Sequence, residues 1–442
     1  MTEYVYGLNN SGLSVAKLLK NQKKSFHCWD DSKKTRDLLK KKFSYLNFIQ
    51  INKSNFKKYK NIYLTPGISI HHDKLLNISK NIIKRDLNLY YQNLKKEKVI
   101  AITGTNGKST TTKLIGEIVK KKFRNIFVGG NIGDALCNSI VNKTRYSHHV
   151  IELSSFQLET IKNFEADISV ILNLSKDHLD RYKNIKEYIK SKKNILNSNS
   201  KSLNIISLDD KYSKNIFYNN KLKNKISFSI NKNSADIYYR NGHIVDKYFY
   251  KKREVKLSNI SSDLSNDYNI QNILASYIVC KYFKIPIKYF IECVRDFKGL
   301  PFRSNIIFNS KSKTVINNSK ATNVGSALLT LYNKKNIYLI LGGVAKKGDD
   351  FEYFSKFKNY INKIYIYGES RFEIKRQIGL TKISKTFVNL DCLITNLCID
   401  LSLTNDKSTI IFAPACASYD QFENFEKRGH YFNKLILNKI KK

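Results

Sequence analysis

Short apolar runs alternate along the chain with longer amphipathic stretches. The runs are rich in Ile, Val, Leu and Tyr, which is typical of strands buried within a sheet. The stretches between them have the length and the spacing of apolar residues that are typical of helices. This alternation predicts an α/β fold in which mostly parallel sheets are covered by helices. The predicted strands lie at residues 4–6, 62–64, 99–102, 150–151, 168–172, 337–341, 364–367 and 409–412.

Two breaks interrupt this alternation. A charged segment at residues 95–98 precedes a new strand, and Gly299-Leu300-Pro301 ends a helical stretch. Glycine and proline are the strongest signals for the end of an element. A chain of 442 residues is also too long for a single core, so two or three domains are expected. The breaks place domain boundaries near residues 93 and 299.

The composition indicates a packed protein with a large positive charge. Hydrophobic residues make up 42% of the chain and aromatic residues 12%, as in globular proteins. A formal charge of +42 would attract nucleic acid or an anionic membrane if the basic residues were clustered. The lysines are instead spread along the whole chain, and no basic stripe alternates with aromatic residues. We therefore expect no specific nucleic-acid partner, although a phosphate-rich substrate would still be attracted.

Cysteine usage and apolar run length bear on the cellular compartment. The chain has seven cysteines, an odd number, and none lies in a CxxC pair. This pattern favours buried, reduced thiols over a disulfide framework. Residues 1–12 show no basic stretch followed by an apolar core, and no run of about 18 uninterrupted apolar residues occurs. The sequence therefore predicts a cytoplasmic protein without a membrane partner.

A glycine-rich turn follows the predicted strand at 99–102 and precedes a helical pattern at 111–121. Backbone amides of such a turn, together with the N-terminus of the helix, form a cradle for phosphate groups. Lys108 would reach the terminal phosphates of a nucleotide, and Ser109 or Thr110 would reach a magnesium ion. We therefore expect a nucleotide site formed by Gly104, Thr105, Asn106, Gly107, Lys108, Ser109 and Thr110.

The turn departs from the strict phosphate-loop expression, because Ile102 stands where the first glycine would be. An ordinary helix start capped by serine or threonine is the alternative interpretation. Two candidate metal ligands follow in the chain: Glu152 ends a predicted strand, and His178 lies in a polar segment. Each alone is more typical of a solvated glutamate or a structural histidine. Together after a phosphate loop, they favour a site for the metal that phosphoryl transfer requires.

Five ordered blocks of sequence resemble the Mur ligase family from end to end. The blocks are GTNGKST at 104–110, ELSSFQLE at 152–159, NLSKDHLDRY at 173–182, NSKATN at 318–323 and FAPACASYDQF at 412–422. The last two resemble the branch of the family that adds D-glutamate. The resemblance implies three domains at residues 1–93, 94–299 and 300–442. These would be a Rossmann-like domain for the UDP-substrate, a central mononucleotide-binding domain of the phosphate-loop type, and a Rossmann-like domain for the amino acid.

The resemblance implies an ATP-dependent ligase that forms an amide bond and releases ADP. Such an enzyme joins D-glutamate to UDP-N-acetylmuramoyl-L-alanine through an acyl phosphate, in peptidoglycan biosynthesis. It would use ATP and two Mg2+ ions, and we expect a monomer whose partners are small-molecule substrates. Another amide ligase of the Mur or folylpolyglutamate type is the alternative among enzymes. A non-catalytic Mur-like binding protein with a positive surface is the alternative outside them.

The resemblance also assigns binding residues in the first two domains. The UDP-substrate would contact Asn9, Ser11, Asp30, Ser32, Thr65 and, in the central domain, Asn131. Asn272 would face the adenine of ATP. Without the resemblance, Asn272 and Asn269 are equally well interpreted as surface amides on one face of a helix.

Catalytic residues and metal ligands follow from the same resemblance. The catalytic residues that it implies are Lys108, His178, Lys192 and Lys320. The metal ligands that it implies are Ser109, Glu152, His178 and Lys192. Lys192 matches a lysine that becomes carbamylated and so acquires oxygen ligands for a magnesium ion. The sequence alone predicts something different, a solvated basic face formed by Lys190, Lys192 and Lys193.

In the C-terminal domain the resemblance implies a site for D-glutamate, whose two carboxylates would bind cationic and hydroxyl groups. The implied residues are Lys320, Thr322, Lys346, Ser418 and the backbone near Phe425. Arg303 and Asn318 would lie near the nucleotide.

Two departures from the family pattern affect these nucleotide contacts. The family usually has His-Arg-x-Glu where residues 302–305 are Phe-Arg-Ser-Asn, and it has aspartate where this chain has Asn318. The second change affects contacts with the ribose or with magnesium-bound water and argues for weakened activity, although an amide still accepts a hydrogen bond.

Overall fold

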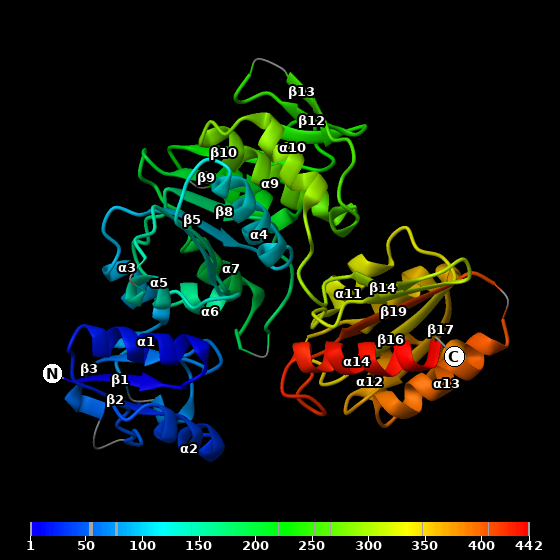
Figure 1. The fold of residues 1–442 in the computed structure, drawn as a ribbon, viewed down its shortest axis with the longest axis horizontal. Helices are drawn as coiled ribbons and strands as arrows, with labels where there is room; N and C mark the ends of the chain where they lie inside the picture. Colours follow the sequence, from blue (N-terminus) through cyan, green and yellow to red (C-terminus); the bar gives the residue numbers. More distant parts are fainter. Residues whose placement is uncertain are drawn as a thin grey trace. The chain divides into compact units, whose positions relative to one another are not determined.

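The computed structural model describes residues 2–52, 56–75, 78–142, 144–179, 181–219, 221–250, 253–265, 267–346, 348–404 and 406–440. The chain forms two compact units. The first comprises residues 1–174, 186–260 and 269–296, and the second comprises residues 175–185, 261–268 and 297–442. Three β-sheets flanked by helices make up these units, which confirms the predicted α/β fold (Figure 1). The domain boundaries near residues 93 and 299 stay predictions.

The first sheet is parallel, with the strand order β2-β1-β3-β4. Side chains alternate between its faces, so Val5 packs in one apolar core while Tyr4 and Tyr6 pack in another. The strands are β1 (Thr2–Tyr6), β2 (Phe26–Trp29), β3 (Tyr59–Leu64) and β4 (Ile83–Lys84). The helices are α1 (Asn10–Asn21), α2 (Lys33–Lys42) and α3 (Asp86–Gln92), with short 3-10 helices η1 (Phe56–Lys58) and η2 (Asp73–Leu75).

The second sheet has the strand order β13-β12-β11-β10-β9-β8-β5-β7-β6 and is parallel from β6 to β11. Strand β5 lies in the interior of this sheet, between β7 and β8. The carboxyl end of β5 therefore lies at the topological switch point, where the strand order reverses. The first five strands are β5 (Lys98–Thr103), β6 (Ile126–Gly130), β7 (His148–Glu152), β8 (Ile168–Ile171) and β9 (Leu203–Ser207). The others are β10 (Lys225–Ser229), β11 (Ile237–Arg240), β12 (His243–Asp246) and β13 (Arg253–Lys256).

Strands β9 to β13 are absent from the predicted set, and the last three pair in an antiparallel arrangement. The pattern held one signal for them. Asn241 and Gly242 connect β11 to β12 with backbone φ angles of 47° and 81°. Consecutive left-handed residues of the Asn-Gly type are the preferred two-residue hairpin turn. The turn therefore extends the parallel sheet with an antiparallel edge.

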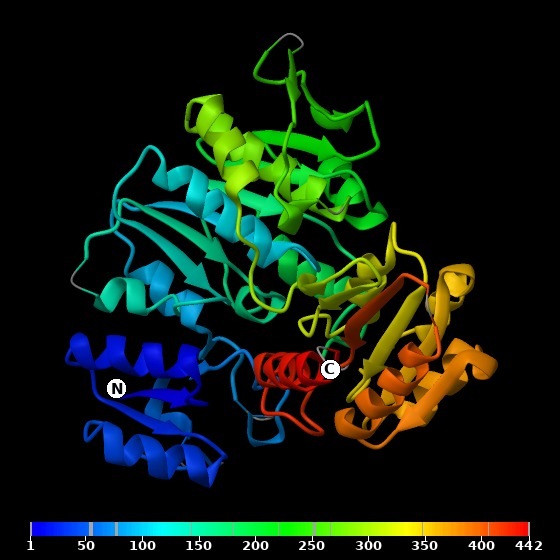
Figure 2. The ribbon, with the colours of Figure 1, turned by 45° about the vertical axis from the view of Figure 1, so that its right-hand side comes forward.

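Helices cover the second sheet, and α4 packs on β5, β6 and β7 with α10 beside it (Figures 1 and 2). Helix α4 begins at Lys108, three residues before the helical pattern in the sequence. Asn269 and Asn272 are 3% and 1% exposed on α9, so their interpretation as surface amides is wrong. The helices are α4 (Lys108–Lys120), α5 (Asn138–Val141), α6 (Ser155–Leu158), α7 (Ile185–Lys193), α8 (Lys211–Asn219), α9 (Tyr268–Tyr282) and α10 (Ile287–Asp296).

The third sheet belongs to the second unit and has the order β14-β15-β19-β16-β17-β18. Alternating side chains build a core on each face. Leu339 packs with residues of α11 and α12, and Ile340 packs with residues of α13 and α14. Figure 2 shows α14 in red beside the strands. The strands are β14 (Asn305–Asn309), β15 (Lys313–Asn317), β16 (Ile337–Gly342), β17 (Ile361–Tyr367), β18 (Ser384–Phe387) and β19 (Ser408–Ala415).

The helices of the second unit include short 3-10 turns. They are η3 (Ser262–Leu264), α11 (Val324–Leu331), η4 (Phe351–Tyr360), α12 (Arg371–Ile378), η5 (Thr381–Ile383), α13 (Leu390–Ser402) and α14 (Phe425–Ile440). Over the described part of the chain, no helix is both long and apolar enough to cross a bilayer. All seven cysteines are free thiols, and five of them are buried.

Arg85 ties the first sheet to the second within the first unit. Its fully buried guanidinium donates hydrogen bonds to the carbonyl oxygens of Leu64 (3.2 Å), Thr65 (2.5 Å) and Ile68 (2.9 Å). It also forms an ion pair with Glu159, which follows α6 and is 9% exposed at its side chain. A buried charge is stable only when all its donors are matched in this way. Arg85 therefore fixes the loop after β3, which carries Thr65.

We expect Arg85→Ala to lower the free energy of unfolding by about 3–5 kcal/mol, because it leaves the Glu159 carboxylate buried without its cation. Arg240→Ala is the matched control, since the Arg240–Glu254 pair is 53% and 42% exposed. That control should lose at most about 1 kcal/mol. Urea denaturation followed by circular dichroism measures both, and equal losses would contradict the role given to Arg85.

Candidate functional site

The glycine-rich turn lies between β5 and α4, at the carboxyl end of an interior strand. Gly104 and Gly107 have φ angles of 156° and 83°, and Gly107 is the N-cap of α4. A β-carbon on Gly107 would lie 2.3 Å from Oδ1 of Asn272. The left-handed backbone and this close approach both require glycine. The turn therefore directs the first amides of α4 toward the space beyond the strand, where a phosphate binds.

Asn173 holds the turn in this shape. Its Oδ1 accepts a hydrogen bond from the Asn106 amide (2.8 Å), and its Nδ2 donates to the Asn106 carbonyl (3.0 Å). Its own carbonyl accepts from the Thr105 amide at 2.8 Å. Its Nδ2 also donates to Oε1 of Gln271 at 2.7 Å. Asn173 thus joins the phosphate turn to α9. This network fixes the conformation of the backbone to which a nucleotide would bind.

Two lysine side chains contact the turn. Nζ of Lys108 donates to the carbonyls of Gly104 (2.9 Å) and Thr105 (2.7 Å). Nζ of Lys192 donates to the Gly104 carbonyl (2.8 Å) and to Oγ1 of Thr103 (3.3 Å). Lys192 is only 2% exposed, so the solvated basic face predicted from the sequence alone is wrong for this residue. The Lys108 cation at this loop favours a polyphosphate ligand.

Glu152 supplies the acidic side of the same site. It ends β7, is 1% exposed, and accepts hydrogen bonds from Oγ of Ser109 and from Nδ2 of Asn131 (2.8 Å for the latter). Carboxylate and hydroxyl oxygens are the ligands that Mg2+ prefers, with phosphates and water completing its shell. Among the described residues, no group of three or more His, Cys, Asp and Glu side chains is arranged to hold a metal by itself. Ser109 and Glu152 therefore fit a magnesium ion that is shared with a bound phosphate.

The predicted contacts for the UDP-substrate gather at the carboxyl edge of the first sheet. The Leu8 amide donates to Oδ2 of Asp30 (2.7 Å), and Oδ1 of Asp30 accepts from the Ser32 amide (3.0 Å). A β-carbon on Gly7, which has a φ of 85°, would lie 2.3 Å from Oγ1 of Thr65. The neighbouring Asn9 is the exposed N-cap of α1. The structure therefore brings the loops after β1, β2 and β3 together.

Ser11 is engaged with a residue that the sequence did not indicate. Its hydroxyl donates to the carboxylate of Asp86, which also accepts from Nε2 of Gln157 at 3.1 Å. Burial raises the pKa of Asp86, and the hydrogen bonds from Ser11 and Gln157 act in the opposite direction. Asp86 lies in no motif, and its hydrogen bonds with Ser11 and Gln157 show that it links the first sheet to the ELSSFQLE block.

In the second unit, Asp177 gathers the predicted residues around its carboxylate. Oδ1 of Asp177 lies 3.1 Å from Nζ of Lys346, and Oδ2 accepts from Nδ2 of Asn323 at 3.2 Å. Nε2 of His178 lies 3.6 Å from Oδ2 of Asp177. The His178 segment, the NSKATN block and Lys346 are therefore joined within one unit. Glu152, the other predicted metal ligand, belongs to the first unit.

Of the predicted D-glutamate residues, Lys320 and Thr322 follow β15, Lys346 follows β16, Ser418 follows β19, and Phe425 begins α14. Nζ of Lys320 lies 4.0 Å from the centre of the Phe425 ring, a favourable cation–π distance. The fully buried Arg428 donates to Oγ and the carbonyl of Ser319 (3.1 and 2.8 Å) and to the Cys416 carbonyl (3.0 Å). It thereby holds the segments that carry Lys320 and Ser418. Ser418 is buried, and Thr322 is half-buried beside Asn323.

Asn318, where the family usually has aspartate, is directed into its own unit. Its side chain is 6% exposed, and its Nδ2 donates to Oγ1 of Thr330 on α11 at 2.7 Å. Arg303 is half-buried in the loop before β14. The Asn318 amide thus donates a hydrogen bond to the Thr330 hydroxyl. An aspartate at this position would instead accept a hydrogen bond from that hydroxyl.

The chain is similar to known proteins, both in its middle part and over nearly its whole length. The model of the Mur ligase middle domain matches residues 102–280. A UDP-N-acetylmuramoylalanine--D-glutamate ligase of Rickettsia bellii (strain RML369-C) is 36% identical over 98% of this chain and 96% of its own length.

The chain belongs to the Mur ligase family. Solved structures of this kind share its fold. The UDP-N-acetylmuramate-alanine ligase MurC of Thermotoga maritima aligns with a TM-score of 0.58 at 16% identity, covering 100% of this chain and 99% of that one. A folylpolyglutamate synthase of Mycobacterium tuberculosis, complexed with ADP and AMPPCP, aligns with a TM-score of 0.58 at 13% identity, covering 79% of this chain and 93% of that one. The predicted family is confirmed.

Gly107→Ala tests whether the phosphate turn of this Mur ligase needs glycine at that position. Gly242→Ala is the matched control, because Gly242 has a similar φ of 81° and nothing within 4 Å of an added β-carbon. The control should lose about 1–2 kcal/mol of unfolding free energy through backbone strain. Gly107→Ala should lose about 1–3 kcal/mol more, because the methyl group overlaps Asn272.

Urea denaturation measures the two losses, and calorimetric titration with ATP measures binding. We expect weakened ATP binding in the Gly107 variant alone. Equal stability losses together with unchanged ATP affinity would contradict the assigned geometry.

Proposed function

We propose that this chain joins D-glutamate to UDP-N-acetylmuramoyl-L-alanine, with ATP converted to ADP and phosphate, in peptidoglycan biosynthesis. The observation that carries the proposal is the phosphate turn at residues 104–110, in which Lys108 and Ser109 lie, with Lys192 bonded to its Gly104 carbonyl and Glu152 bonded to Ser109. The chain is 36% identical, over 98% of its length, to a UDP-N-acetylmuramoylalanine--D-glutamate ligase. This similarity supports the choice of substrates.

The reaction proceeds in two steps. The carboxylate of the alanyl group attacks the γ-phosphorus of ATP, and ADP leaves, so that an acyl phosphate forms. The amine of D-glutamate then attacks the acyl carbon, loses a proton, and displaces inorganic phosphate. Lys108 and the amides of the phosphate turn stabilise the negative charge on the transferred group. Asn272, Arg303 and Asn318 contribute to the nucleotide site.

The amino-acid site uses cationic and hydroxyl groups of the second unit. Lys320, Lys346 and Ser418 bind the two carboxylates of D-glutamate, and Thr322 and the backbone of Phe425 complete the site. Asp177 orients Lys346 through their 3.1 Å contact. Holding the amine in one orientation raises the rate of attack without a change in chemistry.

Magnesium ions would be held by Ser109, Glu152, His178 and Lys192. When bound, they neutralise charge on the phosphates. The burial of Lys192 beside the Gly104 carbonyl supports its carbamylation, which replaces a buried cation with oxygen ligands. Carbamylation makes the reaction rate depend on dissolved carbon dioxide. An unchanged rate in carbon-dioxide-free buffer contradicts this part of the proposal.

The UDP-substrate binds at the carboxyl edge of the first sheet. Its contacts there are Asn9, Ser11, Asp30, Ser32 and Thr65. Asn131 holds Glu152 and contacts the same substrate. Three domains, at residues 1–93, 94–299 and 300–442, a cytoplasmic location and a monomeric state complete the proposal.

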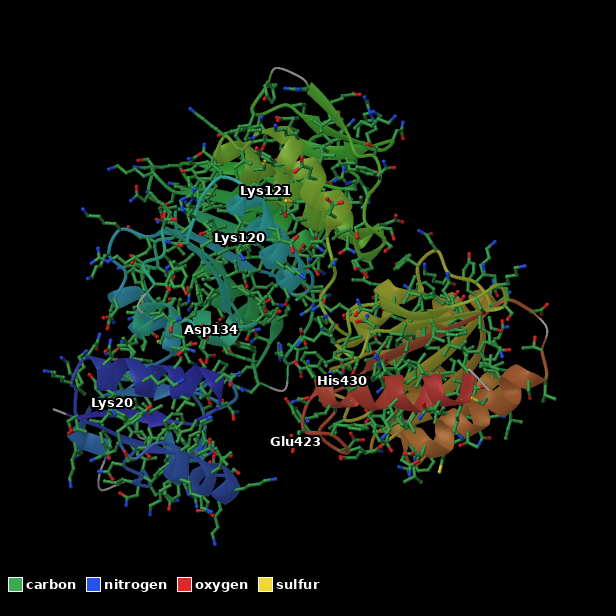
Figure 3. All side chains as sticks on the ribbon, viewed as in Figure 1. Lys20, Lys120, Lys121, Asp134, Glu423 and His430 are labelled. Atoms are coloured by element: carbon green, nitrogen blue, oxygen red, sulfur yellow. The ribbon has the colours of Figure 1, made fainter. Side chains whose placement is uncertain are left out.

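A phosphate-release assay tests the function directly. With UDP-N-acetylmuramoyl-L-alanine, ATP and magnesium, we expect release that depends on D-glutamate and not on L-glutamate. Lys108→Ala should lower the rate by about 10²–10³-fold, because it removes a cation that stabilises the transferred phosphoryl group. Lys120→Ala is the control on the same helix, since Lys120 is exposed (Figure 3).

Release that is equal with the two isomers would contradict the proposed amino acid. An active Lys108 variant would contradict the role of the turn. Binding of generic DNA without any release would favour a non-catalytic Mur-like protein.

A further inference from the structure

The loop that carries Arg303 has an unusual backbone. Phe302 and Ser304, on either side of Arg303, have φ angles of 61° and 57°. Residues with a β-carbon adopt this left-handed region only at an energetic cost. Two such residues flanking one arginine require that the surrounding structure hold the loop in place.

Helix α14 holds the loop through the side chain of Phe302. The Phe302 ring is buried against Gly429. A β-carbon added to Gly429 would lie 2.3 Å from Cδ1 of Phe302. The ring also meets His430 edge-on, with 4.7 Å between ring centroids; His430 is labelled on α14 in Figure 3. Glycine in mid-helix is otherwise unfavourable. Its presence here makes a socket for the ring.

The backbone of the loop is bonded to the predicted D-glutamate site. The amide of Lys320 donates to the Phe302 carbonyl at 3.0 Å. Helix α14 is bonded to the same segment, because Nδ2 of Asn317 donates to the Gly429 carbonyl (3.0 Å) and Oγ of Ser319 donates to the Phe425 carbonyl (2.8 Å). Displacement of the ring would therefore disturb Arg303 and Lys320 together.

Two further hydrogen bonds brace the strained loop. Oδ1 of Asn305 accepts from the Arg303 amide at 3.1 Å, and the Tyr268 hydroxyl donates to Oγ of Ser304 at 3.2 Å. Both partners belong to the second unit, as Phe302 and Gly429 do. The Arg303 backbone is thus fixed from both sides within one unit.

We propose that Phe302 and Gly429 are positioning residues that set Arg303 for the nucleotide and Lys320 for the amino acid. The inference rests on the proposed function. The packing of the Phe302 ring against Gly429 would then couple the nucleotide site to the amino-acid site. Neither Phe302 nor Gly429 contacts a substrate in this account.

Gly429→Ala tests the proposal by placing a methyl group where the ring lies. We expect the KM values for ATP and for D-glutamate both to rise by about tenfold, because small displacements of binding groups are costly. The KM for the UDP-substrate should stay unchanged, since its predicted contacts lie in the first unit. Alanine favours a helix more than glycine does, so any loss of stability would come from the overlap with the Phe302 ring and not from the helix itself.

Two more variants keep the test decisive if Gly429→Ala fails to fold. Phe302→Ala removes the ring and should raise the same two KM values, whereas Phe302→His keeps a flat ring and should restore most of the affinity. Lys434→Ala, an exposed change on α14, is the control for effects of the helix itself.

The outcomes separate this inference from the proposed function. If the unmodified chain releases no phosphate with D-glutamate, the proposed function fails and this inference fails with it. If that chain is active while Gly429→Ala and Phe302→Ala keep both KM values within about twofold, only the positioning role fails. A rise in all three KM values indicates general damage and also overturns it.

Discussion

The close approach of Gly107 to Asn272 is the constraint on which the phosphate turn depends. A helix start that lacks a β-carbon lies against an amide on α9, and only glycine fits there. The same α9 holds the turn from the other side, through Gln271 and Asn173. The turn is thus held by packing and hydrogen bonds before any ligand arrives, and such preorganisation favours electrostatic stabilisation of a phosphoryl group. Lys108, Lys192 and Glu152 take their places around this fixed backbone.

Much of the fold follows from the sequence, because buried parallel strands give apolar runs that stand out from helical patterns. All eight predicted strands lie within observed strands or extend one of them by a residue, as at 168–172. Eleven strands of the described structure were not predicted, namely β2, β4, β6, β9 to β15 and β18, although Asn241-Gly242 marked a hairpin among them. Residues near that hairpin alternate with less contrast, since β13 is largely exposed. A partly solvated edge strand such as β13 leaves a weaker pattern than a buried one, which does not apply to the buried strands β9 and β10.

The sequence predicts those site residues whose type serves a single purpose in a motif. It does not predict residues whose role depends on how deeply the fold buries them. The glycines and Lys108 of the turn belong to the first kind. Lys192 belongs to the second, since its neighbours Lys190 and Lys193 are less buried and the sequence alone does not separate the three. Asp177 was visible in the NLSKDHLDRY block, yet its contact with Lys346 joins segments far apart in the chain. Asp86 and Arg428 carried no motif at all.

The departures from the family pattern acquire a physical meaning in the second unit. Asn318 donates to Thr330, so the amide in place of a carboxylate is satisfied inside the protein. Phe302, in place of the usual histidine, packs its ring in the socket at Gly429. Both substitutions preserve packing, and neither removes Lys108, Glu152 or Lys320. The chain therefore keeps the groups that the proposed ligase reaction needs.

A crystal structure with a non-hydrolysable ATP analogue and magnesium would show whether the phosphate turn binds the nucleotide. We expect that the β- and γ-phosphates accept hydrogen bonds from the amides of residues 105–109, and that Nζ of Lys108 leaves the Gly104 carbonyl to reach them. A nucleotide bound elsewhere, with Lys108 still on the loop carbonyls, would contradict this expectation.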